Sequence, residues 1–394
     1  MQRAGRQVMA GAAGAPIRPW RRWQRHGWIL LALAVAVAFA WGPVARHVRA
    51  ASALLRFEQV EEGVGGWVAE VGRQPVVRED LTLDTEAGAV RARRYRPKGN
   101  TAAPPLLLVH GVHFRGMDEP RLVQFARVLA SAGLDVVTPH VPSLVASRVE
   151  PAATRLIGAS AAAMAEQTAS EAVGVMGISF AGGLALLAAA DPAYEARIGY
   201  VAAVGAHHDL VRVARWFAGQ PARGPDGEVA SVEPHPYGAG VIIHRHVDSF
   251  FPPGDVPEAK KAFELLLHER WKEARARLPN LSAEGQKRLR AMLWPDEDRT
   301  ALRRTMLDVI DAKRGAFRRV SPIGKLDDLQ SPVLLIHGTN DPVVPSTESL
   351  WIAHELPPGS LEEVVITPLL RHAERNGDEP QWRQRWNLVH FLAR

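Results

Sequence analysis

The 394-residue chain contains no cysteine. Disulfide bonds and a cysteine nucleophile are therefore excluded, and the cysteine count does not indicate a redox compartment. The chain also lacks a convincing G-x-G-x-x-G loop, because the glycines near residues 174–183 are accounted for by a different turn. No nicotinamide or phosphate-binding loop is expected, and no cofactor.

Acidic residues are missing from one end of the chain. Residues 1–49 include eight arginines and no aspartate, glutamate or lysine. The net charge of +6 belongs to this segment, because acidic and basic residues nearly balance in the remainder. Nucleic-acid binding requires a basic face on the folded domain, so the composition does not support it.

Charged residues are also absent between Arg25 and Arg46, where residues 27–45 form an apolar run. Its length is close to the roughly 20 residues that cross a bilayer, and tryptophans cluster at its two ends. Six arginines precede the run and two follow it closely. We therefore expect a basic cytoplasmic N-terminus at 1–26, a single transmembrane anchor at 27–45, and the rest of the chain on the extracytoplasmic side.

Two other interpretations of this segment stay open. Ala38-Phe39-Ala40 has the A-x-A pattern of a signal-peptide cleavage site, although Trp41-Gly42-Pro43 is a poor sequence to follow it. Cleavage would give a secreted or periplasmic protein. A buried core helix is less favoured, because a helix apolar on all sides at this end of the chain has little to pack against.

The sequence Gly177-Ile178-Ser179-Phe180-Ala181 follows an apolar run and precedes a helical pattern. It predicts a strand, a tight turn and a helix. A serine at the apex of such a turn has its hydroxyl pushed clear of the backbone and its amide near the positive end of the helix. The small residues at 177 and 181 allow the close approach that the turn needs. Ser179 is the candidate nucleophile.

Three further segments repeat the pattern of a strand ending in polar residues. The aliphatic run 106–109 ends in His110-Gly111-Val112-His113, and the run 333–336 ends in a loop that carries Asp341. A last predicted strand, 364–367, precedes a loop with His372. Serine, aspartate and histidine thus follow one another along the chain, each after a strand.

With these motifs the chain resembles the α/β-hydrolase superfamily of serine hydrolases over about residues 75–394. The resemblance implies a mostly parallel, doubly wound sheet and a triad of Ser179, Asp341 and His372. The chain departs from the common G-x-S-x-G pattern at Ala181. Relatives with an aspartate nucleophile, which process halides or epoxides, and a dienelactone-type relative with a cysteine do not match Ser179.

The chemistry explains why three such residues are needed. A histidine takes the hydroxyl proton during attack and returns it to the leaving group, and a carboxylate orients the imidazole and stabilises its charged form. The resemblance implies that backbone amides of Val112 and Phe180 form the oxyanion hole, with His113 as the near alternative to Val112. The serine chemistry needs no metal.

Other residues compete for these roles. Asp209 follows the strand-like run 200–204 and is the alternative acid, whereas Asp341 before Pro342 is also typical of a simple turn. The alternative for His372 is an ordinary loop histidine. His390 lies in an amphipathic segment with Trp386, Val389 and Phe391, which predicts a packing helix. We favour Asp341 and His372.

We expect a connector at 46–75 and one hydrolase domain at 76–394, with first strands at 81–83 and 90–96. Residues of about 210–328 depart from the strand-helix alternation and show helical spacing, which predicts a helical cap over the catalytic face or, alternatively, a lateral extension. His244, His246 and Asp248 would share one face of a strand as metal ligands, but solvated or locally paired side chains are favoured.

The sequence therefore predicts a membrane-anchored serine hydrolase that cleaves a carboxylic ester, of a small molecule or a lipid, through an acyl-enzyme on Ser179. A thioesterase, lipase or peptidase would use the same machinery, since fold resemblance does not choose the substrate. The alternative of a different class is a hydrolase-like scaffold that binds without turnover.

Overall fold

The computed structural model describes residues 42–294, 297–370 and 382–394. The predicted anchor at 27–45 falls almost wholly outside these residues, and so does His372. Within the described ranges no helix is both long and apolar enough to cross a membrane.

An eight-stranded sheet forms the centre of the molecule, in the order β1-β2-β4-β3-β5-β6-β7-β8. The first two strands are antiparallel to their neighbours, and the remaining strands run parallel. The strands are β1 (Val76–Thr85), β2 (Gly88–Pro97), β3 (Pro105–Val109), β4 (Asp135–Pro139), β5 (Val173–Ile178), β6 (Ile198–Val204), β7 (Val333–Gly338) and β8 (Leu361–Thr367). The predicted strands all coincide with these, and the mostly parallel sheet is confirmed.

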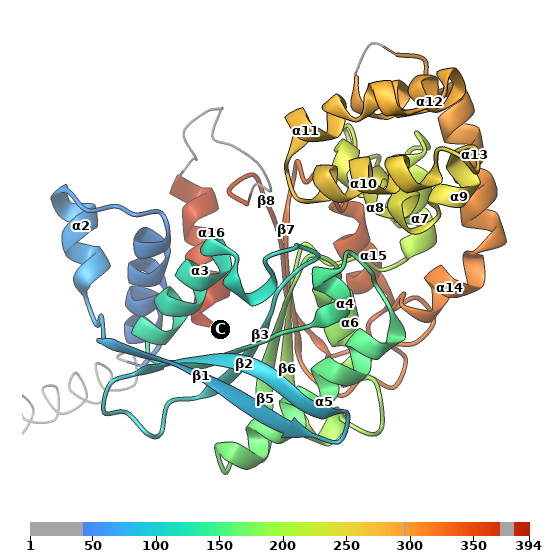
Figure 1. Ribbon diagram of the computed structural model, residues 1–394. Coiled ribbons are helices and arrows are strands. Elements are labelled where there is room, and N and C mark those ends of the chain that lie inside the picture. The colour runs from blue at the N-terminus through green and yellow to red at the C-terminus, as the bar shows by residue number, and fades with distance from the viewer. Residues whose placement is uncertain (1–41, 295–296, 371–381) are drawn as a thin grey trace, which may run out of the picture.

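Helices cover both faces of the sheet (Figure 1). Those that flank the sheet are α3 (Pro120–Ser131), α4 (Pro142–Val145), α5 (Pro151–Gln167), α6 (Phe180–Ala189), α15 (Thr347–Glu355) and α16 (Trp382–Ala393). Short 3-10 turns lie at η1 (Gly116–Asp118) and η2 (Glu195–Arg197).

The apolar side chains of β3 pack against helices on both faces of the sheet. Leu107 and Val109 pack in the larger core with α5 and α6, whereas Leu106 and Leu108 pack in a second core under α3. All four side chains are at most 1% exposed. A central strand buried on both faces needs apolar residues at every position, which is why its sequence does not alternate.

Between β6 and β7 the described residues form helices and one isolated β-bridge, which pairs Arg223 with Val229. The helices are α7 (Leu210–Phe217), α8 (Pro236–Arg245), α9 (Val247–Phe250), α10 (Val256–Leu267), α11 (Trp271–Ala276), η3 (Leu278–Asn280), α12 (Ala283–Leu293), α13 (Thr300–Ala312) and α14 (Arg314–Arg319). Figure 1 shows most of them as a separate layer at one end of the sheet. We call residues 210–319 the helical cap. Phe263, Leu266 and Leu267, which gave the predicted helical spacing, are fully buried in it.

A shared face for His244, His246 and Asp248 as metal ligands would require a strand, and the structure has none there. His244 lies in α8, His246 at the junction with α9, and Asp248 in α9. On helices, residues two apart do not share a face. His244 instead lies 3.7 Å from the carboxylate of Glu264.

The predicted connector is largely helical. Residues 42–57 form one helix, and α2 (Gly63–Glu70) packs beside it, with the Ser52 hydroxyl donating to the carbonyls of Ala69 and Val71. Helix α16 packs on the 42–57 helix through buried Val389 and Phe391, as predicted. Trp386 differs, because it is 55% exposed and stacks on His47.

Candidate active site

Ser179 connects β5 directly to α6. Its backbone has φ 57° and ψ −132°, a region that residues other than glycine rarely adopt. The Ser179 amide donates to the carbonyl of Val204 on the neighbouring strand β6, at 2.6 Å. The predicted strand, tight turn and helix are therefore all present. The serine lies at the carboxyl end of a central parallel strand, where side chains from several loops converge.

The close approach across the turn depends on small residues. A Cβ added to Gly177 would lie 2.4 Å from the carbonyl oxygen of Ala181, and one added to Gly182 would lie 2.8 Å from the Cβ of Ala206. Contacts this short require backbone movement. Position 177 thus requires glycine because the first turn of α6 lies directly against the end of β5.

The loop after β3 lies beside this turn. A Cβ added to Gly111 would lie 3.2 Å from the Cβ of Ser179, so the two segments are in close contact and a larger residue would require a small shift of one of them. Val112 follows in this loop. Phe180 is the first residue of α6, and its amide has no acceptor within the helix. These are the two amides that the sequence assigns to the oxyanion hole.

Buried His110 holds the loop. Its Nε2 accepts from the Val141 amide at 3.2 Å, so Nδ1 carries the proton and donates to the carbonyl of Gly111 at 2.8 Å. Burial lowers the pKa of His110 to about 4, which keeps the ring neutral and able to accept. Because the Gly111 carbonyl and the Val112 N–H belong to one planar peptide, this contact also sets the direction of that N–H.

Asp341 lies in the loop after β7 and is 2% exposed. Its Oδ1 accepts from the amides of Val343 and Val344 at 2.8 and 3.0 Å, which fixes the carboxylate in the loop. Its Oδ2 lies 3.5 Å from Nε2 of His337, whose ring is itself held by the Val344 carbonyl and the Ser349 hydroxyl. The aspartate is thus oriented by its own loop.

The sequence profile of the alpha/beta hydrolase fold family matches residues 104–368, two thirds of the chain. The chain belongs to that family. The match includes Ser179 and Asp341 and ends before His372.

Solved structures of alpha/beta hydrolases resemble this hydrolase-fold protein at low identity. The esterase of Pyrobaculum calidifontis is 17% identical, with a TM-score of 0.41 and coverage of 84% of this chain and 82% of the esterase. The 2-hydroxy-6-oxo-6-phenylhexa-2,4-dienoate hydrolase of Rhodococcus sp. strain RHA1 is 16% identical, with a TM-score of 0.39 and coverage of 74% and 91%. A search among curated proteins gives no match.

Asp209 has different contacts from Asp341. Its Oδ1 accepts from the Val211 amide at 2.9 Å, so it caps the start of α7. Its Oδ2 lies 3.4 Å from Arg318 of α14. The amides of His208 and Asp209 donate to buried Glu348. These contacts are those of a residue that holds the first cap helix on the sheet.

The cap supplies residues that the sequence reasoning missed. The Tyr237 hydroxyl of α8 donates to the carbonyl of Val112 at 3.2 Å, and the His235 amide donates to the carbonyl of Pro342 at 2.7 Å. The only signal in the sequence was His235-Pro236, because proline is favoured in the first turn of a helix. Nothing in that signal indicates which loops the helix reaches. Among the described residues no group of three potential ligands could hold a metal ion.

Proposed function

We propose that this protein is a serine hydrolase that cleaves a carboxylic ester or a related acyl bond. The observation that carries the proposal is the strained backbone of Ser179, at φ 57°, directly beside Gly111 of the oxyanion loop. Strain of this kind costs about 1–3 kcal/mol and persists where the surroundings enforce it, often at catalytic residues. With ψ at −132°, Ser179 also lies outside the left-handed helical region, where residues with a positive φ are usually found.

In the proposed reaction the Ser179 hydroxyl attacks the acyl carbonyl while His372 takes its proton. The tetrahedral oxyanion accepts from the amides of Val112 and Phe180, with His113 as the alternative to Val112. His372 then protonates the leaving alcohol, and water releases the acyl group by the reverse roles. Asp341 orients the imidazole and stabilises its positive charge.

The contacts of the two aspartates support Asp341 as the acid. Two amides of its own loop hold one oxygen of Asp341, a geometry that aims a carboxylate without neutralising it. Asp209 instead caps α7 and pairs with Arg318. Removing Asp209 is therefore expected to loosen the cap more than the triad.

The experiment compares wild type with Ser179→Ala. A fluorophosphonate probe should label the wild type and not the variant, and hydrolysis of p-nitrophenyl acetate should fall by about 10⁴-fold or more. The melting temperature should change little, because the hydroxyl contributes little packing. An unlabelled, inactive wild type would favour the alternative, a hydrolase-like scaffold that binds without turnover.

The substrate class needs a separate measurement. Thioesterases, lipases and peptidases would use the same triad, and the cap shapes the acyl pocket. A panel of p-nitrophenyl esters from acetate to palmitate, with a thioester and an anilide of the preferred acyl group, reports both chain length and bond type. Faster turnover of the thioester or the anilide would replace the ester assignment.

We further propose that residues 27–45 anchor the protein in a membrane, with the N-terminus cytoplasmic. Support comes from exposed apolar side chains at the end of this segment and after it, which are Val44 and Val48 in the 42–57 helix and Val64 and Trp67 in α2. These side chains are 37–80% exposed. Exposed apolar side chains gathered on one part of a protein are typical of an interaction surface, and tryptophan favours the membrane interface.

The absence of cysteine allows a direct test on the full chain in nanodiscs. A fluorophore on Val64→Cys should be quenched by spin-labelled lipids, whereas one on Val229→Cys, a 48% exposed valine of the cap, should not. Equal quenching of both fluorophores would mean that these exposed side chains do not support the proposed membrane anchor. A mature protein that begins near residue 41 in cells would favour signal-peptide cleavage.

A further inference from the structure

The oxyanion loop, residues 110–115, is contacted by the helical cap at two separate places. The first is the hydrogen bond from the Tyr237 hydroxyl to the Val112 carbonyl, at 3.2 Å. The second lies two residues further along the loop, where the ring centroids of Phe114 and His268 lie 4.7 Å apart. Beside it, His113 lies 3.7 Å from the carboxylate of Glu269.

Tyr237 belongs to a short segment that connects two catalytic loops. Two residues before it, the His235 amide donates to the carbonyl of Pro342, adjacent to Asp341. The His235 ring accepts from the Tyr237 amide at 3.2 Å, which caps the start of α8. The segment His235–Tyr237 therefore extends from the loop of the acid to the loop of the oxyanion hole.

Tyr237 is placed to act on the Val112 amide through the backbone. His110 holds the carbonyl of Gly111, in the peptide plane before Val112, and Tyr237 holds the carbonyl of Val112, in the plane after it. With both planes held, neither dihedral of Val112 turns freely. The direction of the Val112 N–H is then set before substrate arrives, which is the condition for strong oxyanion stabilisation.

We propose that Tyr237 is a positioning residue for the oxyanion hole. The cap then contributes to catalysis in addition to covering the site. The proposal rests on the proposed function, since it assumes that Val112 donates to the oxyanion. Its consequence is that cap position governs turnover. A substrate that moves α8 changes the rate of the chemical step and not only its own binding.

The test uses Tyr237→Phe in the full chain, which keeps the ring and removes the hydroxyl. The turnover number for a p-nitrophenyl ester should fall about tenfold with KM within twofold of wild type. Inhibition by a trifluoromethyl ketone, which forms a tetrahedral oxyanion on the serine, should weaken about tenfold. Inhibition by the product alcohol should not change.

Tyr194→Phe is the matched control. The Tyr194 hydroxyl donates to Glu86 in the turn between β1 and β2, away from the oxyanion loop. Each substitution removes one hydroxyl that donates a hydrogen bond, to the Glu86 carboxylate in Tyr194 and to the Val112 carbonyl in Tyr237. Tyr194→Phe should keep the wild-type turnover number and ketone inhibition.

Retention of wild-type turnover and ketone inhibition in Tyr237→Phe would overturn the proposal. So would a rise in KM that accounts for the whole loss, because that pattern indicates a binding contact. If the variant does not fold, His268→Ala removes the second cap contact at an exposed position and should lower turnover about threefold. Wild-type turnover in His268→Ala would then refute the claim that cap position governs turnover. Failure of the wild type to react with fluorophosphonate would instead refute the proposed function.

Discussion

The two ends of the parallel sheet are built differently. At the carboxyl end, Ser179, His110 and Asp341 are nearly fully buried, at 2–6% exposure, and neighbouring loops and the cap hold them. At the amino end the structure has an open pocket of about 560 Å³. Its lining residues come from the segments that precede β1, β3 and β4, together with the 42–57 helix.

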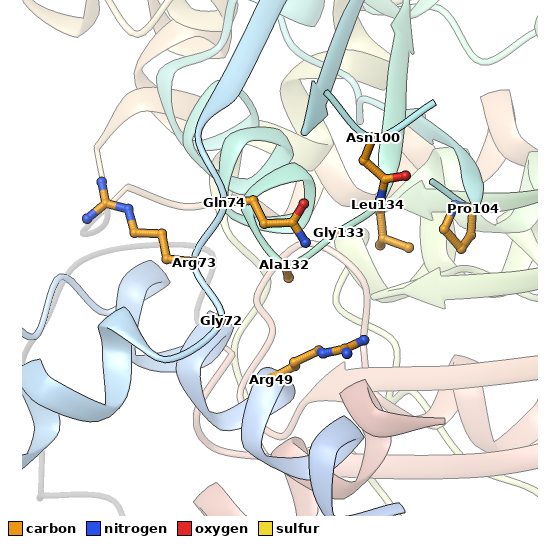
Figure 2. Close-up of a pocket in the computed structure, with 9 residues that line it drawn as sticks. All are labelled: Arg49, Gly72, Arg73, Gln74, Asn100, Pro104, Ala132, Gly133 and Leu134. Atoms are coloured by element: carbon orange, nitrogen blue, oxygen red, sulfur yellow. The ribbon is translucent and has the colours of Figure 1, made fainter. Parts of the chain in front are cut away.

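The pocket at the amino end is polar but not organised for chemistry. Figure 2 shows the guanidinium of Arg73 pointing away from Gln74 and Asn100. Arg73 already pairs with Glu70 at 2.6 Å. None of the lining side chains is a nucleophile or a general base near neutral pH. The hollow alone therefore does not mark the active site.

Buried, oriented polar groups, and not open volume, therefore distinguish the carboxyl end, where we propose the active site. In parallel sheets the carboxyl ends of strands and the amino ends of the following helices meet at one edge, which concentrates amide donors there. The amino end receives helix carboxyl ends instead. Three substitutions and one change of pH test this difference between the two ends of the sheet. They are given in order of expected effect, from the largest to the smallest.

Asp341→Asn should lower kcat by about 10⁴-fold, because an amide does not stabilise the imidazolium or hold the required tautomer. The measurement is ester hydrolysis, normalised to folded protein by circular dichroism. Asp209→Asn is the matched control, because an asparagine oxygen still caps α7 and only the ion pair with Arg318 is lost, so stability should fall slightly while most of kcat is kept. If kcat fell about 10⁴-fold in Asp209→Asn and stayed near wild type in Asp341→Asn, the acid would be Asp209.

Gly177→Ala should damage both stability and activity. Its Cβ would lie 2.4 Å from the Ala181 carbonyl oxygen, so the start of α6 must shift. We expect a loss of about 2–3 kcal/mol in unfolding free energy, in the range of overpacked sites. Turnover should fall about 100-fold, because a 1 Å misplacement has that effect. Gly254→Ala is the control, since no atom lies within 4 Å of its added Cβ and its backbone φ is not positive. Wild-type behaviour of Gly177→Ala would show that the turn is looser than described.

Acidification should weaken the carboxyl end first. Burial is the largest cause that lowers the pKa of His110 and of His207 to about 4, against 6.5 in the unfolded chain. The unfolded state therefore binds more protons below pH 6.5, and stability is lost as the pH falls from 6.5 towards 4. The slope is up to about 1.4 kcal/mol per pH unit for each histidine.

The measurement is urea unfolding between pH 7 and 4.5 for wild type and His207→Gln. The variant should be less stable at pH 7 but should show a shallower pH dependence, since one protonation site of the unfolded chain is gone. Identical slopes would mean that His207 is not held neutral.

Arg49→Ala at the amino end should have the smallest effect. The pocket that Arg49 lines holds no group of the proposed mechanism, so kcat/KM should stay within twofold of wild type. A surface substitution of this kind usually changes stability by less than about 0.5 kcal/mol. A large loss of ester hydrolysis would show that the two ends of the sheet are coupled.

Much of the sheet was predictable from local pattern. The run 106–109 is apolar at every position and 173–177 nearly so, as central parallel strands require, and both lie within β3 and β5. Gly177, Ser179 and Ala181 predicted the turn because that geometry needs small residues on both sides of the serine. His372 lies outside the described residues, so its role as the base stays a prediction.

The alternation at His244, His246 and Asp248 misled because three polar residues at alternate positions also fit the end of one short helix and the start of another. The competing aspartates could not be separated by sequence, since each follows a strand. Their difference lies in what surrounds them, two loop amides for Asp341 and Arg318 for Asp209.

Residue order alone specified the strands, the strained turn at Ser179 and the order of serine and aspartate, because these depend on neighbours within a few positions along the chain. Only the folded molecule decided that Tyr237 reaches Val112, 125 residues away, and that His235 meets the loop of Asp341. Such contacts depend on how the cap packs over the sheet. Packing is a property of many side chains together, and no short stretch of sequence encodes it.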